Sequence, residues 1–417
     1  MAIKTIADID VAGKKLLMRV DFNVPLEDGK ITNDKRIKAA LPTINHALDN
    51  GAAVILMSQL GRPKGEGYEP ELSLKPVADR LGELLNRSVT LGPAEVVGAE
   101  TEEIVSQMNP GDVVLLENLR FHPGETMPDK AKKNPDGKLT EQQQQILNDF
   151  IQALASLAED YVNDAFGTCH RKHASMYGVP EAIKKKGGNA VAGFLVEKEI
   201  KYLHDAIANP ARPFIAILGG VKVSDKIKLI SSLLEKVDRL LIGGAMAYTL
   251  LKSRGVAVGN SIVEEDQVEP MKKILDEAGD KIVLPEDNVI TDDFDNGKPS
   301  LTDGLGIPDG FEGMDIGPRT VEKFKAIIAE AKTIVWNGPM GVFEKPDYAA
   351  GTRAIAQAVA DATQAGAISI IGGGDSAAAV EQMGLADKMT HVSTGGGASL
   401  AFLEGKSMPA LEILDQK

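Results

Sequence analysis

The chain has 417 residues, enough for two or three domains, and its 43% hydrophobic and 25% charged residues are typical of a globular protein. A formal net charge of −14 argues against general binding to nucleic acid, because phosphate backbones require clustered Lys and Arg. The single cysteine, Cys169, excludes an intramolecular disulfide.

The N-terminal sequence MAIKTIADID places polar and acidic residues where a secretory signal would need an apolar run. No apolar stretch approaches the roughly 18 residues that a membrane-spanning helix requires. With the lone cysteine, these features lead us to expect a cytoplasmic protein.

Ten short apolar runs follow one another along the chain, and each is predicted to form a strand. The segments 224–237 and 351–364 between them have helical periodicity. Strands alternating with helices predict an α/β fold with parallel sheets, and the low aromatic content of 4% suits buried parallel strands. The runs are 15–20, 52–58, 112–118, 160–165, 213–220, 239–244, 281–285, 333–338, 367–374 and 391–397.

The runs divide into two sets, which predict two domains. We place an N-terminal domain at 1–186, an interdomain helix at 187–207 that begins with a glycine pair, and a C-terminal domain at 208–404. Within the first domain, 126–140 is predicted to be a polar surface loop, with a helix after Thr140.

Arginines distinguish the strand ends of the first half. Asp21 and Asn23 follow the first run, and four arginines are expected at or just after strand ends. Ligands bind at the carboxyl ends of parallel strands, and Arg makes bidentate contacts to phosphate and carboxylate. Converging arginines would hold a small polyanion, whereas the alternative is four separate surface side chains. They are Arg36, Arg62, Arg120 and Arg171.

A glycine and lysine turn follows the run 213–220. Gly219 and Gly220 precede a predicted helix, so backbone N–H groups could face an anion. Lys222 and Lys226 are four residues apart, which predicts a shared helix face. The spacing is not that of a Walker A loop. The alternative is a tight turn with solvated lysines.

Two triple-glycine turns, 372–376 and 393–399, are each predicted to open a helix. Two helix N-termini directed at one place would stabilise a charged transferring group. Asp375 could hold Mg²⁺, which prefers one or two carboxylates together with phosphate oxygens.

Two other kinds of protein could use such sheets. A nicotinamide dehydrogenase requires G-x-G-x-x-G after an early strand and an acidic residue about 20 positions later, and no such pairing is present. A two-lobed solute-binding protein predicts a signal peptide and has no use for the turn that carries Lys222.

The motifs, taken together and in order, resemble the phosphoglycerate kinase family from the first strand to the C-terminus. They are MRVDFNVP, SQLGRPKG, LENLRF, NDAFGTCHR, LGGVKVSDKI, IGGAMAYTLLK, VWNGPMGVFE, IIGGGDSAA and HVSTGGGASLAFLEGK. The resemblance implies a monomer of two Rossmann-like domains joined by a hinge helix, with the tail 405–417 packing back on the N-terminal domain. It also implies Mg²⁺-dependent, reversible phosphoryl transfer from 1,3-bisphosphoglycerate to ADP, giving 3-phosphoglycerate and ATP.

The resemblance also implies site residues. The catalytic set would be Arg36, Lys222, Gly373 and Gly396. The acid substrate would bind Asp21, Asn23, Arg36, Gln59, Arg62, Arg120 and Arg171. The nucleotide would bind Gly219, Lys222, Lys226, Gly243, Gly244, Ile262, Met314, Asn337, Pro339, Val342, Glu344, Gly373, Gly374, Asp375 and Ser376, with Asp375 on the metal.

This chain departs from the family pattern at two positions. Gln59 stands where the family usually has His, and Ser376 where it usually has Thr. The amide and the hydroxyl keep hydrogen-bonding capacity at both positions.

A general base is not expected, because the carboxylate that accepts or releases the phosphoryl group is already ionised at pH 7. The reaction then requires that the site align the two substrates, neutralise the phosphate charge and exclude water.

Overall fold

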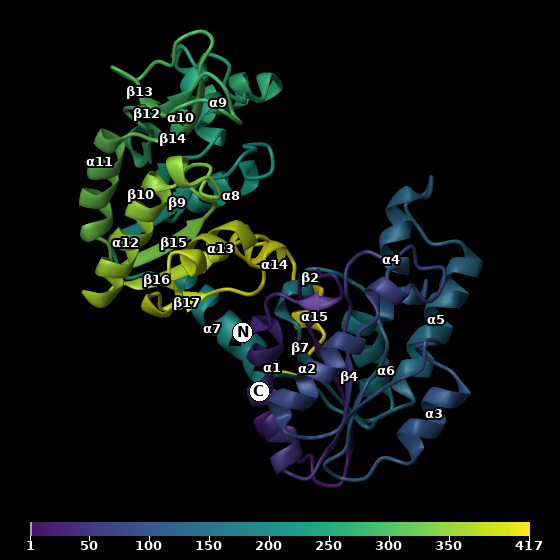
Figure 1. The fold of residues 1–417 in the computed structure, drawn as a ribbon. Coiled ribbons are helices and arrows are strands. Elements are labelled where there is room, and N and C mark those ends of the chain that lie inside the picture. The colour runs from purple at the N-terminus through teal and green to yellow at the C-terminus, as the bar shows by residue number, and fades with distance from the viewer. Residues whose placement is uncertain (1) are drawn as a thin grey trace. The chain divides into compact units, whose positions relative to one another are not determined.

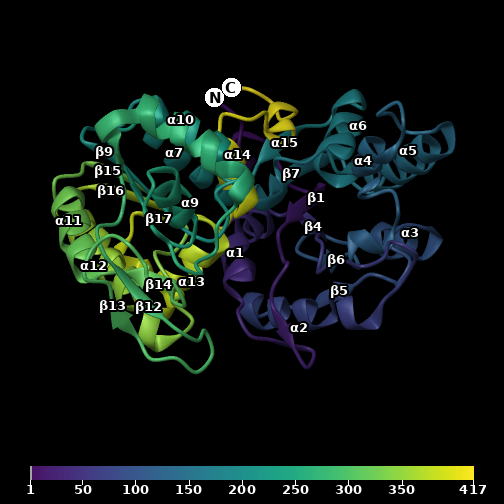
Figure 2. The same cartoon turned by 90° about the horizontal axis from the view of Figure 1, so that it is seen from above.

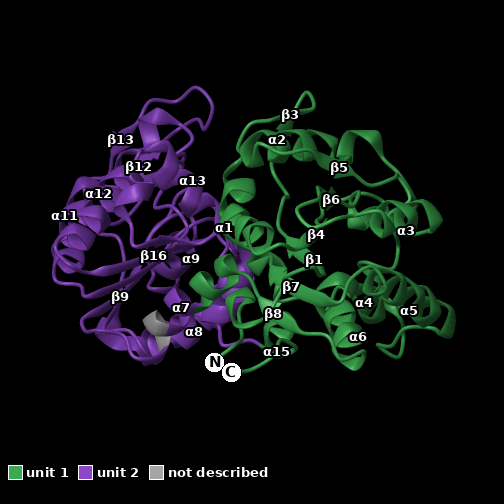
Figure 3. Cartoon of the chain, turned by 90° about the horizontal axis from the view of Figure 1, so that it is seen from below, with its two compact units in different colours: residues 1–200, 407–417 green, residues 201–406 purple. Residues whose placement is uncertain are grey.

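The computed structural model describes residues 2–417, apart from the side chains of 205–207. The chain divides into two compact units, and we describe each by itself (Figure 3). Unit 1 comprises residues 1–200 and 407–417, and unit 2 comprises residues 201–406.

Unit 1 is built on a six-stranded sheet in which every neighbouring pair is parallel. The strand order is β5-β6-β4-β1-β7-β8, so the strand nearest the N-terminus lies inside the sheet. The strands are β1 (Lys15–Val20), β4 (Ala53–Met57), β5 (Val89–Leu91), β6 (Val113–Leu115), β7 (Asp160–Asp164) and β8 (Ala190–Ala192). A separate antiparallel pair consists of β2 (Leu26–Glu27) and β3 (Lys30–Ile31).

Helices connect the parallel strands and cover the sheet (Figure 1). The α-helices are α1 (Lys35–Asp49), α2 (Lys75–Leu85), α3 (Ala99–Ser106), α4 (Met127–Lys130), α5 (Glu141–Ala155), α6 (Val179–Lys185) and α15 (Pro409–Glu412), and α7 (Phe194–Ala208) begins in unit 1 and ends in unit 2. The short η helices are η1 (Ile6–Asp8), η2 (Pro70–Leu72), η3 (Leu119–Phe121), η4 (Ala131–Lys133), η5 (Phe166–Thr168) and η6 (Ala174–Gly178).

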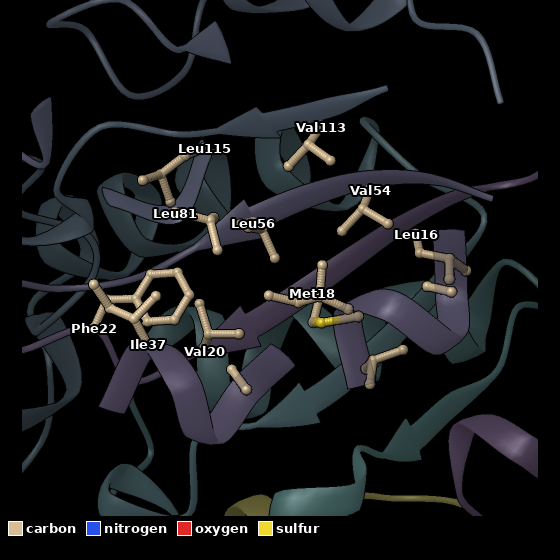
Figure 4. Close-up of a cluster of buried hydrophobic side chains, with 14 of the residues drawn as sticks. Leu16, Met18, Val20, Phe22, Ile37, Val54, Leu56, Leu81, Val113 and Leu115 are labelled. Carbon is tan, nitrogen blue, oxygen red and sulfur yellow. The ribbon is translucent and has the colours of Figure 1, made fainter. Parts of the chain in front are cut away.

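One core of unit 1 lies between the sheet and helices α1 and α2 (Figure 4). Alternate residues of β1, Leu16, Met18 and Val20, belong to it, as do Ile37 of α1 and Leu81 of α2. Because side chains alternate across a strand, Arg19 lies on the opposite face of the sheet. There it contacts Glu125, which follows η3, and Ser175 of η6.

Both ends of the chain lie side by side in unit 1 (Figures 1 and 2). Ile3 and Gln416 form an antiparallel bridge, and the N–H of Lys4 donates to the carbonyl of Asp415 (2.8 Å). The Asp415 carboxylate accepts from the N–H of Ala190 (2.9 Å), which ties the tail to the edge strand β8.

Unit 2 is built on a second six-stranded parallel sheet, in the order β11-β10-β9-β15-β16-β17. Its strands are β9 (Phe214–Leu218), β10 (Arg239–Ile242), β11 (Ile282–Val283), β15 (Thr333–Asn337), β16 (Ile368–Gly372) and β17 (His391–Val392). A smaller antiparallel sheet contains β12 (Asn288–Thr291), β13 (Ser300–Leu301) and β14 (Glu312–Ile316).

The α-helices of unit 2 are α8 (Ile227–Leu234), α9 (Met246–Ser253), α10 (Val268–Ala278), α11 (Pro318–Ala329), α12 (Ala350–Gln364), α13 (Gly374–Gln382) and α14 (Gly397–Leu403). The short ones are η7 (Glu265–Gln267), η8 (Gly279–Lys281), η9 (Pro346–Tyr348) and η10 (Ala386–Lys388). Helices α11 and α12 pack on one face of the sheet around the fully buried Trp336. None of the helices in the described part of the chain is long and apolar enough to cross a membrane.

The α/β prediction with two parallel sheets is confirmed, and all ten apolar runs contain a strand. The helix predicted after Thr140 is α5, and the Thr140 side chain caps it. The prediction of a plain loop at 126–140 was wrong, because α4 and η4 lie within it. The sequence also failed to reveal β5 and β8, which are three-residue edge strands, and the antiparallel sheet of unit 2.

Candidate functional site

In unit 1 the expected acid-binding residues gather at the carboxyl end of the sheet. The residues come from segments that follow β6, β4, β1 and β7, which are four consecutive strands in the sheet order. Arg36 is the exception, because it lies in the first turn of α1 and not at a strand end. The prediction that placed Arg36 at a strand end was therefore wrong.

Asp21 is the centre of this cluster. One of its carboxylate oxygens, Oδ2, accepts from Arg36 Nη1 (2.8 Å), and the other, Oδ1, accepts from Gln59 Nε2 (2.9 Å). The side chain of Asn23 accepts from the N–H of Gly61 (2.8 Å). These contacts join the segments after β1 and β4 and orient Arg36, which has further guanidinium donors for a ligand.

Gln59 is buried, and both ends of its amide are engaged inside the protein. Its Nε2 donates to Asp21, and its Oε1 accepts from Arg19 Nη2. Gln59 therefore links a buried arginine to the aspartate that holds Arg36.

Arg19 is a member of the cluster that the sequence analysis missed. Its side chain is fully buried, donates to the Ser175 hydroxyl (2.9 Å) and lies 3.8 Å from Glu125 Oε1. The available signal was an arginine inside an otherwise apolar strand, since such a charge is rarely buried without a partner.

Arg120 shows that the arginines converge. Its Nη1 donates to the carbonyl of Gly61 (2.6 Å), while its buried Nε has no hydrogen-bond partner among the described residues. Burial lowers the pKa of Arg120, and the positive charges of Arg19 and Arg171 act in the same direction. An anion beside Arg120 would relieve this repulsion and provide the missing acceptor.

The remaining two arginines of the set are exposed to solvent. Arg171 lies 3.4 Å from Asp129 Oδ2, and the buried His173 also contacts that oxygen, at 3.0 Å. Helix α4 thereby holds Arg171 near Arg120. Arg62, directly after Gly61, is solvent-exposed in the segment that follows β4.

In unit 2 most of the expected nucleotide residues follow β10, β9, β15 and β16, and Gly396 of the expected catalytic set follows β17; these strands are again consecutive neighbours. Ile262 and Met314 are the exceptions, because Ile262 lies between α9 and η7 and Met314 lies in β14.

Three of the segments that follow these strands touch through their backbones. A Cβ atom on Gly219 would lie 2.0 Å from the carbonyl oxygen of Pro339, and one on Gly244 would lie 2.5 Å from the nitrogen of Gly220. Glycine is therefore required where these segments cross, because a larger residue at Gly219 or Gly244 would collide with the backbone of the neighbouring segment.

The lysine turn differs from its prediction. Lys222 and Lys226 do not share a helix face, because both precede α8, which begins at Ile227. Lys222 is exposed, whereas Lys226 folds back so that a Cβ atom on Gly220 would lie 3.3 Å from its Nζ. Burial lowers the pKa of Lys226, and the nearby carboxylates of Asp225 and Asp375 oppose that change.

Both triple-glycine turns open helices, as predicted. Gly373 caps α13 and Gly396 caps α14, each with a positive φ (91° and 49°) that suits glycine. The two helices follow β16 and β17, which are paired, so both N-termini are at the same edge of the sheet.

Around the first of these turns, Asp375 and Ser376 have different environments. The hydroxyl of Ser376 is fully buried and accepts from the N–H of Gly338, so it holds two loops together. The Asp375 carboxylate is exposed in the first turn of α13 and close enough to Lys226 to affect its pKa. The described residues contain no cluster of three metal-ligating side chains. A single free carboxylate fits a Mg²⁺ ion that takes its other ligands from phosphate and water.

The residues expected around adenosine differ in exposure. Ile262 is 52% exposed although apolar, and Glu344 is exposed, whereas Met314 is buried and its carbonyl accepts from Val342 (2.9 Å). The next residue, Asp315, accepts from the N–H groups of Ile316 and Gly351 and so ties β14 to the start of α12. Burial raises the pKa of Asp315 to about 7.

Comparisons with known proteins agree with this arrangement. The family model for phosphoglycerate kinase matches residues 6–406. The chain is 52% identical to the phosphoglycerate kinase of Lactobacillus johnsonii over 417 residues, covering 100% of both, and 52% identical to that of Clostridium novyi over 419 residues, covering 99% of both.

Solved structures agree as well. The phosphoglycerate kinase of Coxiella burnetii superposes with a TM-score of 0.84 at 38% identity, covering 99% of this chain and 98% of that one. The Pyrococcus horikoshii enzyme gives a TM-score of 0.83 at 33% identity with the same coverage. Sequence, sheet topology and the residues at the strand ends lead to one conclusion: this chain belongs to the phosphoglycerate kinase family.

Proposed function

We propose that this phosphoglycerate kinase binds its acid substrate through the arginine cluster of unit 1 and its nucleotide through the glycine loops of unit 2. In the reaction, the bond between phosphorus and the carboxyl oxygen of 1,3-bisphosphoglycerate breaks. A bond forms between phosphorus and a β-phosphate oxygen of ADP, and the carboxylate of 3-phosphoglycerate leaves. No proton needs to be removed from either partner, so the site needs no general base.

Arg120 is the observation that carries the assignment of unit 1. Its buried Nε, which has no partner in the part of the chain that the structure describes, its lowered pKa and the nearby positive charges of Arg19 and Arg171 describe a cationic site that favours an anion. Phosphate and carboxylate match guanidinium geometry. A coupled assay that follows ATP formation from 1,3-bisphosphoglycerate and ADP tests the function directly, and absence of ATP formation would refute it.

In unit 2 we propose that Lys222, Lys226 and the N-termini of α13 and α14 meet the nucleotide phosphates. The charge that builds up on the transferring phosphoryl group would be stabilised there by Lys222, and from the acid side by Arg36. Mg²⁺ bound to the nucleotide and Asp375 would neutralise phosphate charge. We further propose that the protein acts as a monomer in the cytoplasm.

The exposed arginines provide a test of which ligand each unit binds. Arg62→Ala and Arg171→Ala should each weaken 3-phosphoglycerate binding about tenfold or more, because a charge-assisted bidentate contact is lost. ADP affinity should remain unchanged. Calorimetric titration of each ligand measures both. Arg87→Ala, an exposed arginine elsewhere in unit 1, is the matched control. A variant that loses ADP affinity instead would move that arginine to the nucleotide site.

Because each unit holds one substrate, we propose that both ligands together favour a more compact protein. Exclusion of water protects the acyl phosphate from hydrolysis, and each ligand gains contacts with the second unit only when the units meet. Solution X-ray scattering should therefore give a smaller radius of gyration for the ternary complex than for either singly bound form. Equal radii for the ternary complex and the free protein would exclude closure.

A further inference from the structure

The turn that carries Lys222 and Lys226 is fastened by a carboxylate outside it. Glu264 Oε2 accepts from the N–H groups of Val223 (2.6 Å) and Ser224 (3.0 Å), and Oε1 accepts from the Ser224 hydroxyl. The sequence analysis allowed backbone N–H groups of this turn to face a bound anion, with a tight turn as the alternative. Those of Val223 and Ser224 are instead directed to a side chain of the protein.

Glu264 is itself held in place. Its N–H donates to the hydroxyl of Thr249 (3.1 Å), which is buried in α9. Burial alone would raise the pKa of Glu264, but the hydrogen bonds from Ser224 and Val223 outweigh it and lower the pKa. The carboxylate is therefore ionised at neutral pH, and its three bonds to the turn are charge-assisted.

The remaining backbone contacts lie at the two ends of the turn. The N–H of Lys226 donates to the carbonyl of Val223 (2.9 Å), and the N–H of Gly220 donates to that of Pro339 (3.0 Å). Between these points the exposed Lys222 belongs to a stretch without helical hydrogen bonds, because α8 begins only at Ile227. Glu264 thus holds the centre of the turn. Without it, the positions of the two lysines would be fixed only by the backbone contacts at the ends of the turn.

We propose that Glu264 is a positioning residue for phosphoryl transfer, which fixes the turn 221–226 so that Lys222 and Lys226 are directed at the nucleotide phosphates. This inference rests on the proposed nucleotide site. It also connects two parts of that site, because Ile262, expected at the adenosine, is only two residues from Glu264 on the same segment. If Ile262 contacts the nucleotide, the Glu264 carboxylate on the same segment would fix the position of the lysine turn relative to that nucleotide.

The experiment uses Glu264→Gln, which keeps the size of the side chain and removes its charge. We expect kcat to fall about tenfold, as three charge-assisted hydrogen bonds weaken, with a smaller change in ADP affinity and none in 3-phosphoglycerate affinity. The matched control is Glu265→Gln. Glu265 is the next residue along the chain, its carboxylate is exposed and pairs with Lys252, and its loss should leave the enzyme like the wild type. Unchanged kcat in Glu264→Gln overturns the proposal.

A double-variant cycle separates positioning from general stability. If Glu264 acts through Lys222, adding Glu264→Gln to Lys222→Ala should lower kcat no further than Lys222→Ala alone. Multiplicative losses in this background and also in the Lys226→Ala background would overturn the proposal. If Glu264→Gln does not fold, Ser224→Ala removes one of the three bonds, and its kcat should fall about threefold, again without effect in the Lys222→Ala background. A wild-type protein that forms no ATP would instead refute the proposed function.

Discussion

Replacing Lys222 with alanine should lower kcat by about 100-fold or more while changing ADP affinity much less. The ammonium group is exposed on a turn that other contacts fix, so it is free to meet charge that develops during transfer. An interaction that strengthens only in the transition state affects kcat, whereas one present in the ground state affects KM. Steady-state kinetics and ADP titration together measure the difference.

Lys228→Ala is a suitable control for this variant. Lys228 is exposed in the first turn of α8, six residues away, and has the same charge. Its loss should leave kcat within about twofold, because an exposed charge outside the site contributes little. Retained turnover with only a higher KM in Lys222→Ala would mean that Lys222 binds ground-state nucleotide and does not assist transfer.

Replacing Arg19 with methionine should lower the free energy of unfolding of unit 1 by about 3–5 kcal/mol, the typical result of removing one partner of a buried ion pair. Arg19 and Glu125 are both fully buried, and Arg19 also donates to Gln59 and Ser175. Methionine fills similar space but removes the arginine charge from the Glu125 carboxylate, which keeps only its bonds from Ser175 and its contact with His173. Denaturant unfolding followed by a probe placed in unit 1 measures the change.

A second substitution tests the cause. Adding Glu125→Gln to Arg19→Met removes the unpaired charge and should restore part of the lost stability, since the amide can still accept a bond from Ser175. If the double variant is less stable than Arg19→Met alone, the uncompensated charge of Glu125 is not the cause of the lost stability. A single variant as stable as the wild type would show that the ion pair contributes nothing.

The sequence could predict features that depend on local pattern. Runs such as 53–57 and 333–337 are apolar and rich in β-branched or large side chains, so their strand character is intrinsic. The glycines before α13 and α14 and the capping residue Thr140 also indicate where helices begin. The order of these patterns carries the family resemblance.

Other features were decided only by the tertiary structure. The strands β5 and β8 are too short to show periodicity, and each forms by pairing with an edge that its neighbour, β6 or β7, leaves open. The lysine turn becomes helical only at Ile227, and the partner of the Ser224 N–H is Glu264, 40 residues further along the chain.

Thus the sequence by itself determined the α/β class, the positions of the main strands and the residue types at their ends. It did not determine which side chains would meet, because partners such as Arg19 and Glu125 are separated by about 100 residues and lie on elements that only the folded sheet brings together. Their burial, and with it the need to pair every charge, exists only after the chain has packed.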